Sequence, residues 1–157
     1  MIARTFVAVG LEDPGVHYVL TCERTINAAP QEVWAVWSDV AAYPTWDDRE
    51  ESADISGPLA PGVEVRYRQR GGRSGTYVIT AVDPGRGWTT QEKVPRGFLV
   101  TEHDLTPAGD GQTHVRRTYR VAGLTSIPFR LVVAPGMRRE MEGTFAALER
   151  EVARRRA

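Results

Sequence analysis

Apolar residues follow three different spacings along the chain, and each spacing predicts a different element. Residues 16–26 are rich in Val, Tyr, Leu, Thr and Ile, which is typical of a β-strand. A helical spacing follows and ends near Pro44, with apolar positions at Val33, Trp34, Val36, Trp37 and Val40. From about 51 to 122 apolar and polar residues alternate. The helical spacing then returns between Met137 and Val152.

The alternating region predicts an antiparallel meander. Clusters of Gly, Pro and Asp divide it into short segments, which is the pattern of strands joined by tight turns. Parallel strands would need a helical crossover, and the separators are too short to contain one. The predicted strands are 51–56, 63–70, 75–82, 87–93, 97–106 and 113–122.

The two helical regions differ in length. Pro30 suits the first turn of a helix, so two short helical pieces are expected over about 30–44, with 43–46 as the helix exit. The second region is one long helix, preceded by a helical turn at 127–133, and Pro135 and Gly136 are expected to force a kink or a restart between them. Its apolar stripe is Met137, Met141, Phe145, Leu148 and Val152.

The two strands 97–106 and 113–122 support one assignment of inner and outer faces. Pairing their apolar-rich sets places the acidic residues of one strand beside the basic residues of the other on the opposite face. The outer residues are Glu102, Asp104, Arg116 and Arg120. The inner residues are Leu99, Thr101, His103, Leu105, Val115, Arg117, Tyr119 and Val121.

The order of elements predicts an α+β fold. One strand, two short helices, six strands and a long helix require the last helix to cover the concave face of a curved seven-stranded antiparallel sheet. Such a sheet can enclose a small-molecule cavity against the helix. We expect one domain over 16–157, with 1–15 as an N-terminal tail or an extra edge strand.

Several short stretches resemble one known superfamily. They are 26–34 (INAAPQEVW), 38–46 (SDVAAYPTW), 79–84 (ITAVDP) and 105–113 (LTPAGDGQT). In this order, over about residues 18 to 153, they resemble the polyketide cyclase/dehydrase and lipid-transfer superfamily. That resemblance implies the helix-grip fold, shared with STAR-related lipid-transfer domains and the birch pollen allergen. It implies ligand binding, sometimes with catalysis, and no fixed catalytic triad.

The amino-acid composition limits the classes of partner and cofactor that can be expected. Twenty basic and twenty acidic side chains cancel, which gives no electrostatic reason to expect nucleic acid. Without an apolar stretch of roughly 18 residues we expect no integral membrane association, and the single Cys22 favours a reducing, cytoplasmic location. His17, His103, His114 and Cys22 lack metal-ligand spacing, so neither a metal nor another cofactor is expected. A homodimer is left open.

Polar residues on the predicted inner face are the candidates for chemistry. An inward arginine implies a buried acid, a wet cavity or a polar ligand, because burying an unpaired cation is costly. The candidate catalytic residues are Arg117, Tyr119 and His103. The candidate ligand-binding residues are Trp46, Tyr67, Gln69, Trp88, Thr101, Met137, Met141, Phe145, Arg24 and Glu92, with Trp46 expected near the cavity mouth. The structural alternative is that these side chains are core, rim or paired residues.

Three functions remain open at this point. The first is binding of an apolar or aromatic small molecule, polyketide- or lipid-like, in the cavity. The second is a cofactor-independent polyketide cyclase or aromatase that catalyses aldol closure and dehydration. In such a site Arg117 or Arg24 would hold an enolate or carbonyl oxygen, while Tyr119, Tyr67 or His103 relays a proton. The third is a protein-interaction module that uses the groove.

Overall fold

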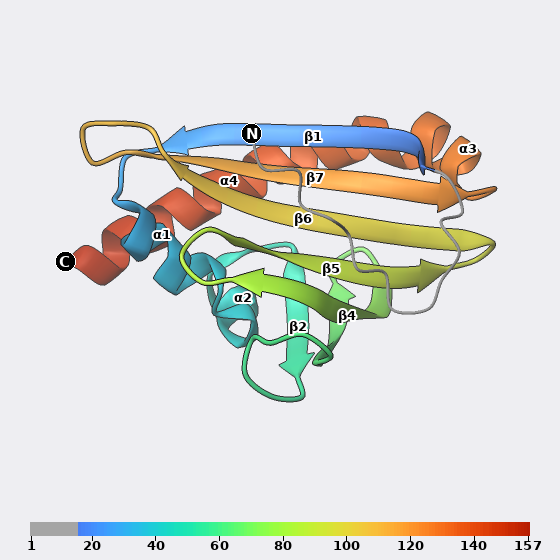
Figure 1. The fold of residues 1–157 in the computed structure, drawn as a ribbon, viewed down its shortest axis with the longest axis horizontal. Helices are drawn as coiled ribbons and strands as arrows, with labels where there is room; N and C mark the ends of the chain where they lie inside the picture. Colours follow the sequence, from blue (N-terminus) through green and yellow to red (C-terminus); the bar gives the residue numbers. More distant parts are fainter. Residues whose placement is uncertain (1–15) are drawn as a thin grey trace.

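A computed structural model describes residues 16–157 and shows a seven-stranded antiparallel sheet against a long helix (Figure 1). The expected tail or edge strand at 1–15 lies outside the described residues. The spatial strand order is β1-β7-β6-β5-β4-β3-β2. The strands are β1 Val16–Ile26, β2 Glu50–Ile55, β3 Glu64–Gln69, β4 Ser74–Asp83, β5 Gly87–Val94, β6 Gly97–Pro107 and β7 Thr113–Gly123.

The strand order follows from the tight turns. Each strand from β2 to β7 pairs with the next one along the chain, and β1 adds to the free edge of β7. The turn between β3 and β4 contains Gly71 and Gly72, whose φ angles of 100° and 93° lie in the region that favours glycine. These observations confirm the predicted α+β class and the antiparallel meander.

The predicted outer face is also confirmed. Asp104 lies opposite Arg116 in the β6–β7 register, and Arg120 Nε donates to Glu102 Oε2 at 3.1 Å. Arg116 Nε in turn donates to Glu23 Oε2 at 3.1 Å on β1. The outer surface of these strands therefore carries paired charges.

Three short helical segments separate β1 from β2: α1 Pro30–Trp37, a 3-10 turn at Val40–Ala42, and α2 Tyr43–Trp46. The prediction that 43–46 is a helix exit is wrong, because these residues form α2. Pro44 lies in the first turn of α2, where its missing N–H would have no helical partner in any case. The effect of Pro44 is to begin a new helix.

The segment from 126 to 156 is continuously helical. It consists of α3 Ser126–Pro128, a π-helical turn at Phe129–Val133 and α4 Ala134–Arg156. Pro135 and Gly136 were expected to force a kink or a restart of the helix. Pro135 lies in the first turn of α4, and the Ala134 N–H bonds to the Phe129 carbonyl across the wider π turn. The π turn thus absorbs the proline without a break in the helix.

Helix α4 lies across one face of the sheet and supplies the core (Figure 1). The predicted stripe from Met137 to Val152 is buried at every position. Near its C-terminal end α4 packs against α1, and Arg156 pairs with Glu32 at 2.5 Å. Glu32 also accepts a hydrogen bond from the Ala29 N–H at 2.8 Å, so one carboxylate caps α1 and binds α4.

No helix within residues 16–157 is both long enough and apolar enough to cross a membrane.

Candidate functional site: a polar pocket between the sheet and helix α4

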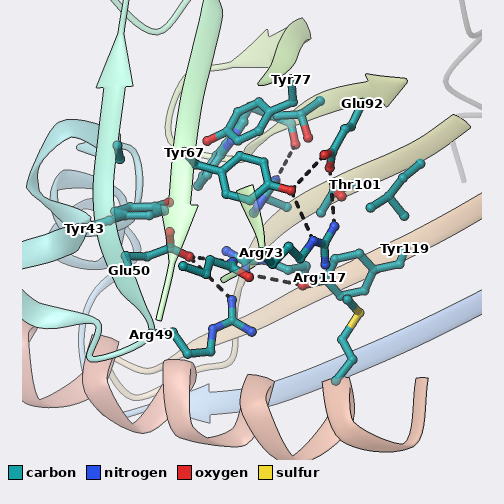
Figure 2. Close-up of a pocket in the computed structure, with 17 residues that line it drawn as sticks. Tyr43, Arg49, Glu50, Tyr67, Arg73, Tyr77, Glu92, Thr101, Arg117 and Tyr119 are labelled. Atoms are coloured by element: carbon teal, nitrogen blue, oxygen red, sulfur yellow. Dashed lines mark hydrogen bonds and ion pairs between the residues drawn. The ribbon is translucent and has the colours of Figure 1, made fainter. Parts of the chain in front are cut away.

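A pocket of about 90 Å³ lies on the inner side of the sheet, above the N-terminal half of α4 (Figure 2). It is smaller than the roughly 300–1,000 Å³ that is usual for drug-sized ligands. Its walls are aromatic and ionisable rather than aliphatic. The lining residues are Tyr43, Arg49, Glu50, Ala53, Tyr67, Gln69, Arg73, Tyr77, Trp88, Thr90, Glu92, Leu99, Thr101, His103, Arg117, Tyr119 and Met137.

Arg117 is the most unusual residue of the pocket. It points inward from β7 and is only 6% exposed, yet no carboxylate in residues 16–157 lies within ion-pair distance. Its guanidinium stands 5.6 Å from the centre of the Trp37 ring. Burial lowers the pKa of Arg117, but the Tyr119 and Tyr43 hydroxyls raise it by more, so the side chain stays charged. Arg117 is therefore a buried cation without a counter-ion among residues 16–157.

A second group of side chains forms a closed hydrogen-bonded cluster (Figure 2). The Tyr67 hydroxyl donates to Glu92 Oε1 at 2.8 Å, and Arg73 contacts both of these residues at 3.2 and 3.4 Å. Burial raises the pKa of Tyr67 to about 12. Gly75 makes the cluster possible, because a Cβ at this position would collide with Glu92 Oε1 and lie 3.0 Å from the Tyr67 hydroxyl.

Glu50 is a buried carboxyl group at the start of β2. Gln69 Nε2 donates to Glu50 Oε1 at 2.9 Å, and Arg49 lies 3.7 Å from the same oxygen. Burial raises the pKa of Glu50, and these two neighbours lower it by less. Glu50 is thus protonated more readily than an exposed glutamate, which suits a proton donor or acceptor.

His103 is held as an uncharged ring. It stacks on Trp88 with ring centres 4.1 Å apart, and its Nδ1 lies 3.3 Å from the Trp88 carbonyl oxygen. Burial and the nearby Arg117 charge lower the pKa of His103 well below its usual value of 6.5. A ring with this pKa is a weak base at neutral pH, and packing alone accounts for its position.

The structure brings most of the predicted site residues together. The three candidate catalytic residues Arg117, Tyr119 and His103 all line the pocket. Six of the ten candidate ligand-binding residues do so as well. They are Tyr67, Gln69, Trp88, Thr101, Met137 and Glu92.

Four predicted ligand-binding residues do not line this pocket. Trp46 is buried against Tyr43, with ring centres 5.0 Å apart, and therefore does not form a mouth. Phe145 is buried against Trp37, and Met141 lies beneath the pocket with its sulfur 2.8 Å from the Tyr119 hydroxyl. Arg24 reaches the surface and pairs with Glu149 at 2.7 Å. The stripe and strand patterns identified buried faces but did not show which part of each face meets the pocket.

Eight lining residues were not among the predicted ones: Tyr43, Arg49, Glu50, Ala53, Arg73, Tyr77, Thr90 and Leu99. For some of them the signal was available. Tyr77 lies two residues before the buried Ile79 on β4, and Thr90 lies two residues after Trp88 on β5. Residues two apart on a strand share a face, so alternation places both side chains inward. Tyr43, Arg49 and Glu50 lie where the chain changes from helix to strand, so no spacing indicated their direction.

The pocket offers charge and hydrogen bonds but no cluster of metal ligands. Within residues 16–157 no three His, Cys, Asp or Glu side chains converge in a way that could hold a metal ion. What the pocket presents is a fixed cation, a protonatable carboxyl and several phenol hydroxyls. Such groups can hold an oxyanion and exchange a proton with a small molecule.

Comparison with solved structures places the fold among helix-grip proteins. Norcoclaurine synthase from Thalictrum flavum, in complex with dopamine and hydroxybenzaldehyde, superposes with a TM-score of 0.71 at 13% identity, covering 97% of this chain and 98% of that chain. Ara h 8.0201 superposes with 0.69 at 19% identity over 88% and 99%. A START superfamily protein from Mycobacterium smegmatis gives 0.63 at 18% identity over 87% and 97%. At these identities the likeness shows the fold alone.

A family model identifies the chain more closely. The model described as polyketide cyclase / dehydrase and lipid transport matches residues 18–153. The chain therefore belongs to this family, as the sequence motifs indicated. No curated protein matches the sequence.

Proposed function

We propose that the protein binds a small aromatic molecule in the pocket between the sheet and α4. The observation that carries this proposal is the composition of the walls. Five aromatic side chains, Tyr43, Tyr67, Tyr77, Trp88 and Tyr119, surround a space that also contains buried polar groups. Rings provide apolar contact area, while a few fixed polar groups orient the ligand.

The size of the pocket limits the ligand. A space of about 90 Å³ is well below the roughly 300–1,000 Å³ of a site for a drug-sized ligand, so a single ring enters only with small side-chain shifts. The small volume favours one-ring molecules over the larger polyketide- or lipid-like ligands that the family description suggests. The structural neighbour crystallised with dopamine and hydroxybenzaldehyde carries one-ring molecules in the same fold.

Methyl NMR on methionine-labelled protein tests the proposal. Addition of hydroxybenzaldehyde should shift the Met137 methyl signal, because Met137 lines the pocket. Ala53→Leu, which fills the pocket from β2, should abolish the shift. Ala81→Leu on the exposed side of β4 is the matched control. A Met137 shift that survives in Ala53→Leu would contradict binding in this pocket.

Proton-transfer catalysis is a second candidate, favoured by Glu50. A buried carboxyl with a raised pKa in the same pocket as an unpaired arginine is suited to proton abstraction beside a carbonyl group, with Arg117 stabilising the enolate oxygen. This is the elementary step of aldol closure and dehydration. A poly-β-ketone chain exceeds the pocket volume, so a smaller ketone is the appropriate substrate.

Hydrogen–deuterium exchange at the methyl group of hydroxyacetophenone tests this second function. The protein should accelerate the exchange, and Glu50→Gln should remove most of the acceleration. The exposed neighbour Glu51 provides the control, since Glu51→Gln alters the same charge outside the pocket. Equal rates in both variants would exclude Glu50 as the base.

The protein-interaction alternative, in which the groove receives a partner segment, gains no support from the pocket, because the lining is charged rather than a continuous apolar surface.

A further inference from the structure

The charges that line the pocket do not balance. Three arginines, Arg49, Arg73 and Arg117, face two glutamates. Glu92 is paired with Arg73 at 3.4 Å, and Arg49 lies 3.7 Å from Glu50 and 3.2 Å from Glu140. Arg117 has no acidic side chain within ion-pair distance among the described residues. It is therefore the lining arginine whose charge no described carboxylate pairs.

Asp47 is a carboxylate that influences Arg117, but its oxygens already accept other hydrogen bonds. Asp47 helps to raise the pKa of Arg117 but makes no ion pair with it. The two carboxylate oxygens of Asp47 accept hydrogen bonds from the Thr144 hydroxyl at 2.9 Å and from the Arg49 N–H at 3.0 Å. Asp47 thus contributes to the local field without neutralising the guanidinium.

The guanidinium of Arg117 also has unused donors. Nη1 lies 3.5 Å from the Tyr119 hydroxyl and 3.3 Å from the Met141 sulfur, which are weak interactions for a cation. Nε is buried without any partner. A buried charged donor left in this state costs several kcal/mol of desolvation. The planar fork of an arginine is matched best by the two oxygens of a carboxylate.

From these observations we propose that the ligand of the pocket is a small aromatic molecule with a singly charged carboxylate or enolate, and that Arg117 binds this anionic group. The inference rests on the proposed function, because it names the chemical class of the molecule bound there. One unpaired cation matches one negative charge, and the surrounding tyrosine rings accommodate the rest of the molecule.

Calorimetry with two molecules of the same shape tests the inference. At neutral pH, para-hydroxybenzoate should bind the protein roughly 10- to 100-fold more tightly than the uncharged para-hydroxybenzamide, the range expected for one charge-assisted hydrogen-bonded contact. In Arg117→Met this preference should disappear. Arg116→Met removes the same charge from the outer face of the same strand and should preserve the preference. Arg117→Lys, which keeps the charge but loses the fork, should give an intermediate ratio.

The possible outcomes separate this inference from the proposed function. Equal affinity for the benzoate and the benzamide, with both excluded by Ala53→Leu, would overturn the anion inference and leave the aromatic pocket standing. Binding of acetate as tight as that of the benzoate would retain Arg117 as an anion site and overturn the aromatic requirement. Failure of all three probes to bind would overturn both. A benzoate preference that persists in a folded Arg117→Met protein would show that another residue holds the anion.

Discussion

The two ends of the space between α4 and the sheet differ in the polarity of their buried side chains. Around the C-terminal half of α4 most buried residues are apolar, including Val33, Phe145, Leu148 and Val152, and the buried Glu151 is paired with two arginines. Around the N-terminal half the buried residues are Arg117, Glu50 and several tyrosines beside an open space. The first end should stabilise the fold, whereas the second should cost stability because charged groups lose their hydration there.

The largest expected effect is at the packed end. Leu148 is completely buried, so Leu148→Ala should lower the free energy of unfolding by about 2–5 kcal/mol through lost contacts and a new cavity. Urea unfolding followed by circular dichroism measures the change. Leu131→Ala, at a 69% exposed position, is the matched control and should change stability by less than about 0.5 kcal/mol. Similar losses in the two variants would refute the contrast in packing.

The next effect has the opposite sign. Arg117→Met replaces a buried cation that lacks a counter-ion with an apolar chain of similar length, and should raise the free energy of unfolding of the ligand-free protein by about 1–4 kcal/mol. Thermal unfolding of wild type and variant without ligand measures the gain. A clear loss of stability would mean that the contacts with Trp37, Tyr119 and Met141 hold the fold together, and the polar end would then not be a costly one.

Glu50 should show a smaller, pH-dependent effect. Because burial raises the pKa of Glu50 above its usual 4.5, the folded state holds this proton more tightly than the unfolded chain does. The corresponding stability is therefore present below pH 4.5 and is lost as the pH rises through the folded-state pKa. Glu50→Gln should match wild type near pH 4 and have a higher Tm near pH 7. A variant of lower Tm at pH 7 would argue for a stabilising ionised Glu50.

Replacing His103 should give the smallest change in stability, and this change should appear only in the pH dependence of Tm. Burial and the charge of Arg117 lower the pKa of His103, so the unfolded chain binds this proton more readily. Its contribution to stability is present above pH 6.5 and is lost as the pH falls. His103→Phe keeps a ring on Trp88 and should flatten the decline of Tm between about pH 6.5 and 5. His114→Phe on the outer face is the control, and equal slopes in wild type and His103→Phe would contradict the prediction.

Most of the fold could be predicted from the sequence because regular elements repeat. Alternation fixed each strand boundary to within one residue, and the helical stripe of α4 is buried at every predicted position. Pro44 was misread because proline both ends helices and begins them, and only its neighbours decide which applies. The π turn before Pro135 has no sequence pattern of its own.

The candidate site could be predicted only where it lies on regular strands. Alternation alone placed Arg117, Tyr119 and His103 on one face, and the structure finds them around one pocket. The direction of Glu50 does not follow from alternation, because the β2–β3 register shifts between Glu50 and Ser52. The clearest sign of function is that the buried Arg117 has no acidic partner within the part of the chain that the structure describes. This can be seen only from three-dimensional positions.

The junction between α4 and α1 bears on how the chain is made. Synthesis proceeds from the N-terminus, so each hairpin from β2 to β7 can pair as soon as its second strand appears. By contrast, β1 can pair only after β7 has been made. The ion pair between α1 and α4 can form only after Arg156 has been made, 124 residues after its partner Glu32. Until residues 134–156 are made, α4 does not cover the inner face of the sheet. The pocket is therefore completed only when α4 docks.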